Sequence, residues 1–347
     1  MTQKKEHLLI LRFSSLGDVA LTIPVIRCLL KTYPNLQITI VSRKAMEPLF
    51  KEFKDINFFA VDFNHRHKGL KGIYQLYNDL RKIPITRIAD LNSVIRTHLL
   101  CFFFKINFFK VKKITKARFE KYLLTRKKNK KFQPLTPTIY RYADVFRRLG
   151  LPVDIQKHEF PLKKGIVPKT ILKEILKNNN EKWIGIAPFA GFPGKIYPLD
   201  LMQKVISYLQ KDYKLFLFGK GKKESQKFDI WQSAYPNVFS TVGLISFGDE
   251  INLISNLDLM ISMDSANGHL SSNFGIPTIT LWGVTHPFCG FTPFGQPIEN
   301  SIFLDREKYP LIPTSIYGEK VFKGYQKALR SIDPKVIIEK AIEILSE

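Results

Sequence analysis

The stretch "LILRFSSLGDVALTIPVIRCLLKTYP", Leu9 to Pro34, indicates the fold class. Its apolar run stops at two serines, a glycine and an aspartate. Apolar residues then return at the three- and four-residue spacing of a helix. A strand, a tight turn and a helix fit this pattern, and "LQITIVS" directly after it reads as a second strand. The segment therefore predicts a β-α-β unit with two parallel strands.

The same alternation of strands and helices continues along most of the chain. In the first half we expect strands near 56–63 and 85–91, and helices over 44–53, 69–81, 94–104 and 138–151. An irregular stretch with three prolines follows, from Pro152 to Lys169, where we expect a domain boundary. Strands at 182–188, 214–219, 237–243, 257–263 and 277–283 then alternate with helices at 198–210, 222–234, 250–256 and 268–274, and a last helix spans 333–345. The sequence predicts an α/β protein with two doubly wound units.

The composition agrees with a globular protein of two domains. The chain has 347 residues, of which 45% are hydrophobic and 24% charged. The apolar run near the N-terminus is broken by Arg12 and is too short for a signal sequence or a membrane span, so we expect a cytoplasmic protein. Three cysteines, far apart and without a CxxC pair, argue against a disulfide framework or a zinc site and are expected to be buried: Cys28, Cys101 and Cys289.

A formal charge of +24 is the strongest compositional feature, because it favours anionic partners of any kind. The charge is concentrated between Lys105 and Lys131, where twelve Lys or Arg stand against the single acid Glu120. Phosphorylated sugars, anionic lipids and nucleic acids all fit such a field. The net charge therefore does not choose among these partners.

The turn from Ser14 to Asp18 is the first candidate site. Gly17 allows a tight turn and a close approach of a ligand to the backbone, and the free amides at the start of the next helix favour anions. Asp18 has two interpretations at this point. It is either a first-turn residue that stabilises its helix by about 1 kcal/mol, or a general base at the mouth of a cleft.

Three further strand ends carry unusual residues. In "IGIAPFAGFPGKIYP", small residues precede Lys195, which suits a phosphate bound by amides and one ammonium, although a flexible loop fits equally well. In "LFLFGKGKKE", a GxG pair without its third glycine favours a turn, with Glu224 available for a ribose hydroxyl. In "LMISMDSANGHL", Asp264, Ser265 and His269 combine a carboxylate, a hydroxyl and helix amides at one place, in outline a diphosphate site.

Several motifs are absent from the sequence. No Asp-x-Asp pair occurs that could hold a metal on a diphosphate, and no GxSxG nucleophile turn occurs. We therefore predict no metal site and no cofactor. We expect helix N-termini and Lys195 to neutralise the charge of a bound phosphate.

Taken together, these segments resemble glycosyltransferase family nine, the ADP-heptose:lipopolysaccharide heptosyltransferases, over nearly the whole chain. The most specific parts are the opening stretch, "GKIYPLDLMQKVI", and "GLISFGDEINLISNLDLMISMDSANGHLSSNFGIPTITLWGVTHP". The resemblance implies a GT-B fold, with two Rossmann-like domains facing a cleft. It implies an N-terminal acceptor-binding domain over 1–155, a C-terminal nucleotide-sugar-binding domain over 165–330, and a final helix over 331–347 that can return to the first domain.

The resemblance also assigns roles to residues. The catalytic base falls on Asp18, and the contacts to the nucleotide sugar fall on Ser15, Gly17, Ala190, Gly191, Lys195, Glu224, Asp264, Ser265, Ala266 and His269. Two departures from the family pattern leave the donor open. Ala266 stands where the family usually has glycine, and Ala190 and Gly191 stand where some members present threonine hydroxyls.

The implied activity is inverting, metal-independent transfer of a sugar, with heptose from an ADP-sugar as the favoured donor, to an anionic lipopolysaccharide-type glycolipid. We expect the enzyme at the cytoplasmic face of the inner membrane, in peripheral contact with it. The basic stretch then forms the acceptor or membrane surface, through Lys112, Lys113, Lys116, Arg118 and Lys121, unless it is only a solvated loop.

Two other classes of protein stay open at this point. One is a basic protein that binds nucleic acid or a membrane surface without catalysis; no helix-turn-helix, zinc finger or aromatic RNA-binding signature supports a nucleic-acid partner. The other is a nicotinamide oxidoreductase, which the missing GxGxxG in the first turn disfavours.

Overall fold

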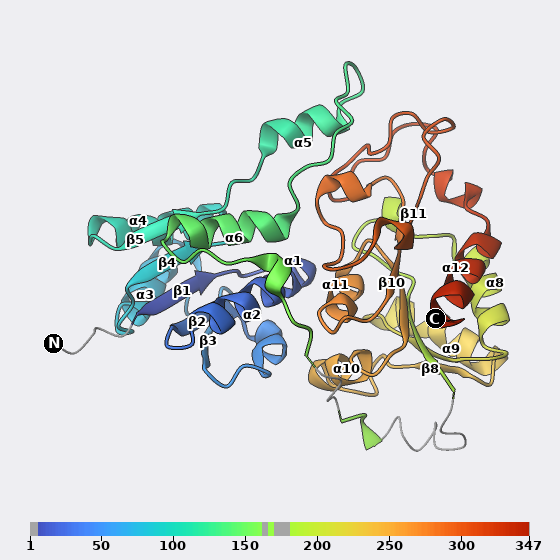
Figure 1. Ribbon diagram of the computed structural model, residues 1–347, viewed down its shortest axis with the longest axis horizontal. Coiled ribbons are helices and arrows are strands. Elements are labelled where there is room, and N and C mark those ends of the chain that lie inside the picture. Colours follow the sequence, from blue (N-terminus) through green and yellow to red (C-terminus); the bar gives the residue numbers. More distant parts are fainter. Residues whose placement is uncertain (1–5, 162–165, 170–180, 347) are drawn as a thin grey trace. The chain divides into compact units, whose positions relative to one another are not determined.

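The computed structural model describes residues 6–161, 166–169 and 181–346. The chain forms two compact units, each discontinuous in sequence. The N-terminal unit comprises Met1–Lys116 and Thr138–Glu159, and the C-terminal unit comprises Ala117–Pro137 and Phe160–Glu347. Each unit contains one parallel β-sheet covered by helices (Figure 1).

The sheet of the N-terminal unit has five parallel strands in the order β3-β2-β1-β4-β5. Their bounds are β1 His7–Leu11, β2 Gln37–Arg43, β3 Ile56–Val61, β4 Arg87–Asp90 and β5 Lys110–Lys113. The flanking helices are α1 Leu16–Ala20, α2 Thr22–Thr32, α3 Gly69–Leu80, α4 Ile95–Ile106 and α6 Thr138–Arg148, with the 3₁₀ helix η1 at Lys44–Phe50. Every residue of β1 is buried, as expected for a central strand with both faces covered.

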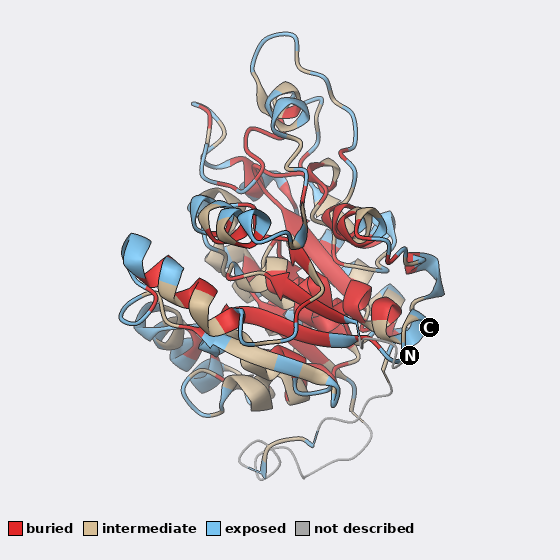
Figure 2. Cartoon of the chain, turned by 90° about the vertical axis from the view of Figure 1, so that its left-hand side faces the viewer, coloured by how far each residue is buried: buried red, intermediate tan, exposed pale blue. Residues whose placement is uncertain are grey.

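The sheet of the C-terminal unit has six parallel strands in the order β11-β10-β9-β6-β7-β8. Their bounds are β6 Trp183–Ala187, β7 Lys214–Leu217, β8 Val238–Ser240, β9 Leu259–Met263, β10 Thr278–Trp282 and β11 Ser301–Phe303. The principal helices are α8 Leu199–Leu209, α9 Lys222–Ala234, α10 Phe247–Ile254, α11 Ala266–Ser272 and α12 Pro334–Ser346. In Figure 2 the strands are largely red, meaning buried, and outward helix faces are pale blue.

Both sheets reverse their strand order at one place, between β1 and β4 and between β6 and β9. Ligands of open parallel sheets bind beyond the carboxyl ends of the strands at such a reversal. The residues that follow β1, β4, β6 and β9 are therefore the ones that matter for function.

The predicted elements are largely confirmed, with local corrections. The helix expected over 44–53 is the 3₁₀ helix η1, which contains Pro48, a residue without the N–H that an α-helix needs. The opening helix is interrupted at Leu21 and forms α1 and α2. Part of the expected boundary over 152–169 lies outside the described residues. The three cysteines are free and buried, as predicted.

The basic stretch corrects the expected domain limits, because 117–137 packs in the C-terminal unit although we assigned 1–155 to the first domain. This segment contains α5, Arg118–Thr125. Leu124 and Leu135 form a small apolar cluster with Cys289 and Ile316. The Lys130 ammonium donates to the carbonyls of Leu124 and Pro313 (2.6 and 2.7 Å). Burial of apolar side chains and paired polar groups thus fixes the segment there.

The last helix, α12, packs within the C-terminal unit. The apolar face of α12 packs against α8, β9 and β10, all in the C-terminal unit. Ile337, Ala341 and Leu345 belong to the main core of that unit. The buried face of α12 is therefore part of the core of the C-terminal unit. No helix within the described ranges has the length and apolar character to cross a bilayer.

Candidate functional site

Asp18 lies just beyond the carboxyl end of β1, in the first turn of α1. Its Oδ2 accepts hydrogen bonds from the Ser15 hydroxyl (2.9 Å) and the Ser15 amide (3.3 Å). The same oxygen forms an ion pair with the Arg12 guanidinium. The Asp18 side chain stays 22% exposed. The carboxylate is therefore fixed through one oxygen and accessible to solvent.

Arg12 is the member of this group that we did not assign from the sequence. Its Nη1 donates to the carbonyl of Leu91, just after β4 (2.7 Å), and its guanidinium lies 6.0 Å from the centre of the Tyr142 ring. Arg12 therefore joins the ends of β1 and β4 at the strand-order reversal of this sheet. The only sequence signal was that this cation interrupts an otherwise apolar strand.

The interpretation of Asp18 as a residue that stabilises its helix agrees with the structure, because the carboxylate accepts hydrogen bonds from Ser15 at the start of α1. All three donors contact Oδ2. Oδ1 accepts no hydrogen bond from the described part of the chain, so this oxygen can take a proton from an incoming hydroxyl.

The C-terminal unit brings two predicted site residues together, Lys195 and Asp264. Lys195 follows β6, Asp264 follows β9, and their Nζ and Oδ2 atoms are 2.9 Å apart. The hydroxyl of Thr285, which follows β10, donates to the same Oδ2 (2.9 Å). Thr285 was not assigned from the sequence. The pair lies at the strand-order reversal between β6 and β9, where a ligand of this sheet is expected.

Lys195 is fixed both by the ion pair of its ammonium with Asp264 and by packing of its aliphatic stem. A Cβ placed on Gly318 would lie 2.3 Å from Cδ of Lys195, so the aliphatic stem packs directly on the Gly318 backbone. Gly318 also adopts a φ of +99°, which side chains rarely tolerate. With 13% of its side chain exposed, Lys195 is a positioned cation and not the solvated lysine of the alternative interpretation. Ala190 and Gly191 precede it in the same loop, with Gly191 exposed.

Ser265 follows Asp264 in the chain and directly precedes helix α11. Its Oγ is buried and has no hydrogen-bond partner in the described structure. A buried hydroxyl without a partner is costly, which indicates a group that bonds to a ligand. Ala266 starts the helix and its amide remains available, whereas His269 is buried within the helix.

Glu224 lies in the first turn of α9. Its Oε2 accepts a hydrogen bond from the Lys220 amide (2.6 Å), so one oxygen holds the turn after β7 in place. The structural interpretation of this residue therefore applies to Oε2. The second oxygen, Oε1, is not engaged in that bond.

The predicted membrane or acceptor surface is divided between the units. Lys112 and Lys113 belong to strand β5, and Lys116 ends the same stretch of the N-terminal unit. Arg118 and Lys121 belong to α5 in the C-terminal unit. The Lys121 ammonium donates to the Tyr317 hydroxyl (2.8 Å) and lies 5.2 Å from the centre of the Phe291 ring. Lys121 is thus a packing residue within its unit.

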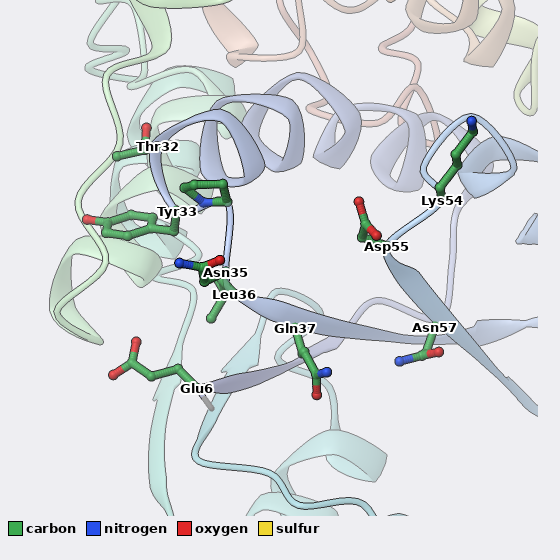
Figure 3. Close-up of a pocket in the computed structure, with 10 residues that line it drawn as sticks. Glu6, Thr32, Tyr33, Asn35, Leu36, Gln37, Lys54, Asp55 and Asn57 are labelled. Atoms are coloured by element: carbon green, nitrogen blue, oxygen red, sulfur yellow. The ribbon is translucent and has the colours of Figure 1, made fainter. Parts of the chain in front are cut away.

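An open cavity of about 1000 Å³ lies at the opposite edge of the N-terminal sheet (Figure 3). Its lining comes from the end of α2 and the starts of β2 and β3: Glu6, Thr32, Tyr33, Pro34, Asn35, Leu36, Gln37, Lys54, Asp55 and Asn57. None of these residues is a predicted site residue. Because the strands are parallel, this edge is remote from their carboxyl ends and from Asp18.

Glu250 on α10 is an ionisable group that the sequence analysis did not single out. Burial raises the pKa of its carboxyl to about 7, against the lowering effects of the neighbouring Asn267 side chain and the charge of Lys220. The unfolded chain releases this proton near pH 4.5, whereas the folded chain keeps it until about pH 7. The free energy of unfolding therefore falls as pH rises from about 4.5 to about 7, and this loss persists at higher pH.

Replacing Glu250 with Gln is expected to raise the free energy of unfolding at pH 8 by up to about 3 kcal/mol, because the neutral amide removes the cost of burying a charge. At pH 4 the two proteins should be equally stable. Urea unfolding at pH 4 to 8 measures the difference, with the exposed Glu339→Gln variant as control. A Glu250→Gln effect that is the same at both ends of this range would contradict the assignment.

Comparison with known proteins identifies the chain. The model of the family "Glycosyltransferase family 9 (heptosyltransferase)" matches residues 73–312, well over half of the sequence. This chain belongs to glycosyltransferase family 9. The family match includes Lys195 and Asp264, and the resemblance noted in the sequence is confirmed.

Individual members of glycosyltransferase family 9 match almost end to end. "Lipooligosaccharide heptosyltransferase 2" of Haemophilus influenzae is 24% identical, over 98% of this chain and all of the relative. The E. coli ADP-heptose lps heptosyltransferase II has a TM-score of 0.69 at 17% identity, with 98% of each chain covered. E. coli heptosyltransferase WaaC, solved with ADP, has a TM-score of 0.69 at 13% identity, covering 97% of this chain and 99% of the other. The fold is thus GT-B, as expected.

Family membership decides between the classes left open by the sequence. The chain is a glycosyltransferase of the heptosyltransferase family, and the prediction of an enzyme is confirmed. The described ranges contain no group of three or more His, Cys, Asp or Glu side chains placed to hold a metal ion.

Proposed function

We propose that this glycosyltransferase transfers heptose from ADP-heptose to an anionic lipopolysaccharide-type glycolipid, with inversion and without a metal. One observation carries the proposal. Lys195 is held 2.9 Å from Asp264 at the strand-order reversal of a family 9 enzyme, beside the buried, unpartnered hydroxyl of Ser265. A positioned ammonium next to a hydroxyl without a hydrogen-bond partner suits the binding of a diphosphate.

The proposed reaction is a single displacement. The acceptor hydroxyl oxygen bonds to the anomeric carbon as the bond from that carbon to the diphosphate oxygen breaks. The electron pair of the broken bond leaves with ADP, and the hydroxyl proton passes to Oδ1 of Asp18. Arg12 and Ser15 hold Oδ2, so the carboxylate keeps the orientation that the proton transfer needs. One displacement inverts the configuration at the anomeric carbon.

In this proposal, negative charge that develops on the departing diphosphate is stabilised by the Lys195 ammonium, the Ser265 hydroxyl and the first-turn amides at Ala266. These groups take the place of a metal ion. Asp264 orients Lys195, which balances the charge of the carboxylate, and Asp264 also accepts a hydrogen bond from Thr285. Ala190 and Gly191 offer backbone amides, and Oε1 of Glu224 is assigned to a ribose hydroxyl. Gly17 and His269 are assigned, as the resemblance implies, to contacts with the nucleotide sugar.

We also propose that the enzyme works in the cytoplasm, in peripheral contact with the inner membrane where a glycolipid acceptor is embedded. The relatives named above act on lipooligosaccharide or lps according to their names, which supports an acceptor of this class. The basic surface residues favour an anionic lipid environment.

A panel of ADP-, UDP- and GDP-sugars tests the donor. A ligand that binds only the folded state at a concentration of about 100 times its Kd stabilises that state by about 2.7 kcal/mol. We expect ADP-heptose to raise the unfolding temperature most, and the transferred sugar to have the opposite anomeric configuration. Protection by UDP- or GDP-sugars alone would overturn the choice of donor, and a retained configuration would overturn the single displacement.

A further inference from the structure

Helix α4 of the N-terminal unit is apolar on two opposite faces. Its inner face packs in the core through Leu100, Cys101 and Phe104. Its outer face carries Ile95, Phe102 and Ile106, which are 86%, 56% and 55% exposed. These three residues are seven and four positions apart, so they share one side of the helix. Phe108, two residues beyond the end of the helix, is 98% exposed.

The exposed apolar surface continues onto α3, which packs beside α4. The Tyr74 ring of α3 lies 5.4 Å from the Phe103 ring of α4, and Phe103 lies 6.0 Å from Phe102. Tyr74 and Leu70 on α3 are 51% and 76% exposed. We call this the α3–α4 surface, made of Leu70, Tyr74, Ile95, Phe102, Ile106 and Phe108. Contiguous apolar surface of this kind usually marks a site of interaction.

The charge around the α3–α4 surface is almost entirely positive. Residues 69–116 contain ten Lys or Arg and two acids, Asp79 and Asp90. Asp90 is fully buried, and Asp79 is paired with Arg66 at 2.8 Å. The exposed cations of α3 and α4 themselves are Lys71, Arg96 and Lys105. None of these three forms an ion pair with a carboxylate in the described ranges.

We propose that the α3–α4 surface docks this protein onto an anionic lipid bilayer. Aromatic and aliphatic side chains would enter the boundary between headgroups and acyl chains, and the lysines and arginines would pair with headgroup phosphates. A second copy of the chain is disfavoured as the occupant, because it would bring two sets of unpaired cations together. The proposal places the membrane contact on α3, α4 and the beginning of the basic stretch, and it does not depend on the transfer reaction.

Flotation of the full-length protein with phospholipid vesicles tests the surface. We expect binding to phosphatidylcholine vesicles that contain about 30 mol% phosphatidylglycerol, and weaker binding to pure phosphatidylcholine. The variant Phe102→Ser/Ile106→Ser/Phe108→Ser should lower the partition coefficient by about tenfold or more. The variant Lys71→Gln/Arg96→Gln/Lys105→Gln should weaken binding to anionic vesicles and reduce its dependence on salt.

Ile230 on α9 provides the matched control, since it is 58% exposed but belongs to the C-terminal unit. Ile230→Ser should bind vesicles like the original protein. Tryptophan probes give a second readout: Phe108→Trp fluorescence should be quenched by brominated lipids, whereas Ile230→Trp should not. All variants should unfold at the original temperature, because the replaced side chains are exposed.

Three results would overturn the proposal. The first is an original protein that does not bind anionic vesicles, and the second is a triple serine variant that binds them equally well. The third is a dimer in sedimentation velocity that dissociates in the triple serine variant without any vesicle binding, which would identify a second copy as the occupant. Donor protection and transfer to a detergent-dispersed acceptor should persist in all variants, so failure here is distinguishable from failure of the proposed reaction.

Discussion

Asp18→Asn is expected to lower turnover by about 10²–10⁴-fold while leaving the affinity for ADP nearly unchanged. The amide has almost the same shape as the carboxylate but cannot take the acceptor proton. It can still accept hydrogen bonds from Ser15 and Arg12 through its oxygen. Steady-state kinetics with ADP-heptose, together with calorimetric titration of ADP, separates the loss of chemistry from a loss of binding.

The chain contains a matched control for this substitution. Asp249 bonds to Ser246 at the start of α10 as Asp18 bonds to Ser15 at the start of α1, with the serine hydroxyl donating at 2.7 Å. If Asp18 acts only on its helix, Asp18→Asn and Asp249→Asn should cost similar stability, about 1 kcal/mol, and neither should affect turnover. Unchanged turnover in Asp18→Asn would remove Asp18 from its proposed role.

Lys195→Gln is expected to weaken binding of the ADP-sugar by about 10- to 100-fold, because a hydrogen bond to a charged group contributes about 1.5–3 kcal/mol. Turnover should fall as well, since the charge on the leaving diphosphate grows in the transition state. Titration with ADP and with adenosine gives the sharpest measurement. ADP should lose affinity, and adenosine, which has no phosphate, should not.

Lys335→Gln serves as the control for removing a lysine. Its ammonium is 3.5 Å from Glu339, and its side chain is 76% exposed. This substitution should change neither affinity nor turnover, because exposed ion pairs contribute little. Equal affinity of Lys195→Gln and the original protein for ADP would show that the diphosphate binds elsewhere.

Much of the fold follows from the periodicity of the sequence, and the exceptions have physical causes. Strand β5, "KVKK", was not predicted because an edge strand can expose lysines and still pair through its backbone with β4. Strand β11 has three residues, too few for a periodic signal. Helix α5 lies in a segment whose charge dominates its pattern, and its place in the C-terminal unit depends on long-range contacts of Leu124 and Leu135 that no local pattern encodes.

The site was predictable in its parts but not in its contacts. Lys195 and Asp264 each follow an apolar run and were singled out for that reason, yet only the pairing of β6 with β9 brings them together. Arg12 and Thr285 were missed because a single arginine or threonine after a strand carries no motif of its own. The roles proposed for Asp18 and the nucleotide-binding residues stay predictions until variants are measured.

The assignment of 117–137 to the C-terminal unit means that the backbone passes between the two units three times, after Lys116, after Pro137 and after Glu159. A single cut cannot separate them. A fragment ending near residue 155 would leave Leu124 and Leu135 without Cys289 and Ile316, and a fragment starting there would lack α5. Chimeras with related enzymes should therefore exchange 117–137 together with the C-terminal unit. Substrate preference can then be exchanged without exposing the apolar side chains of this segment, which would promote aggregation.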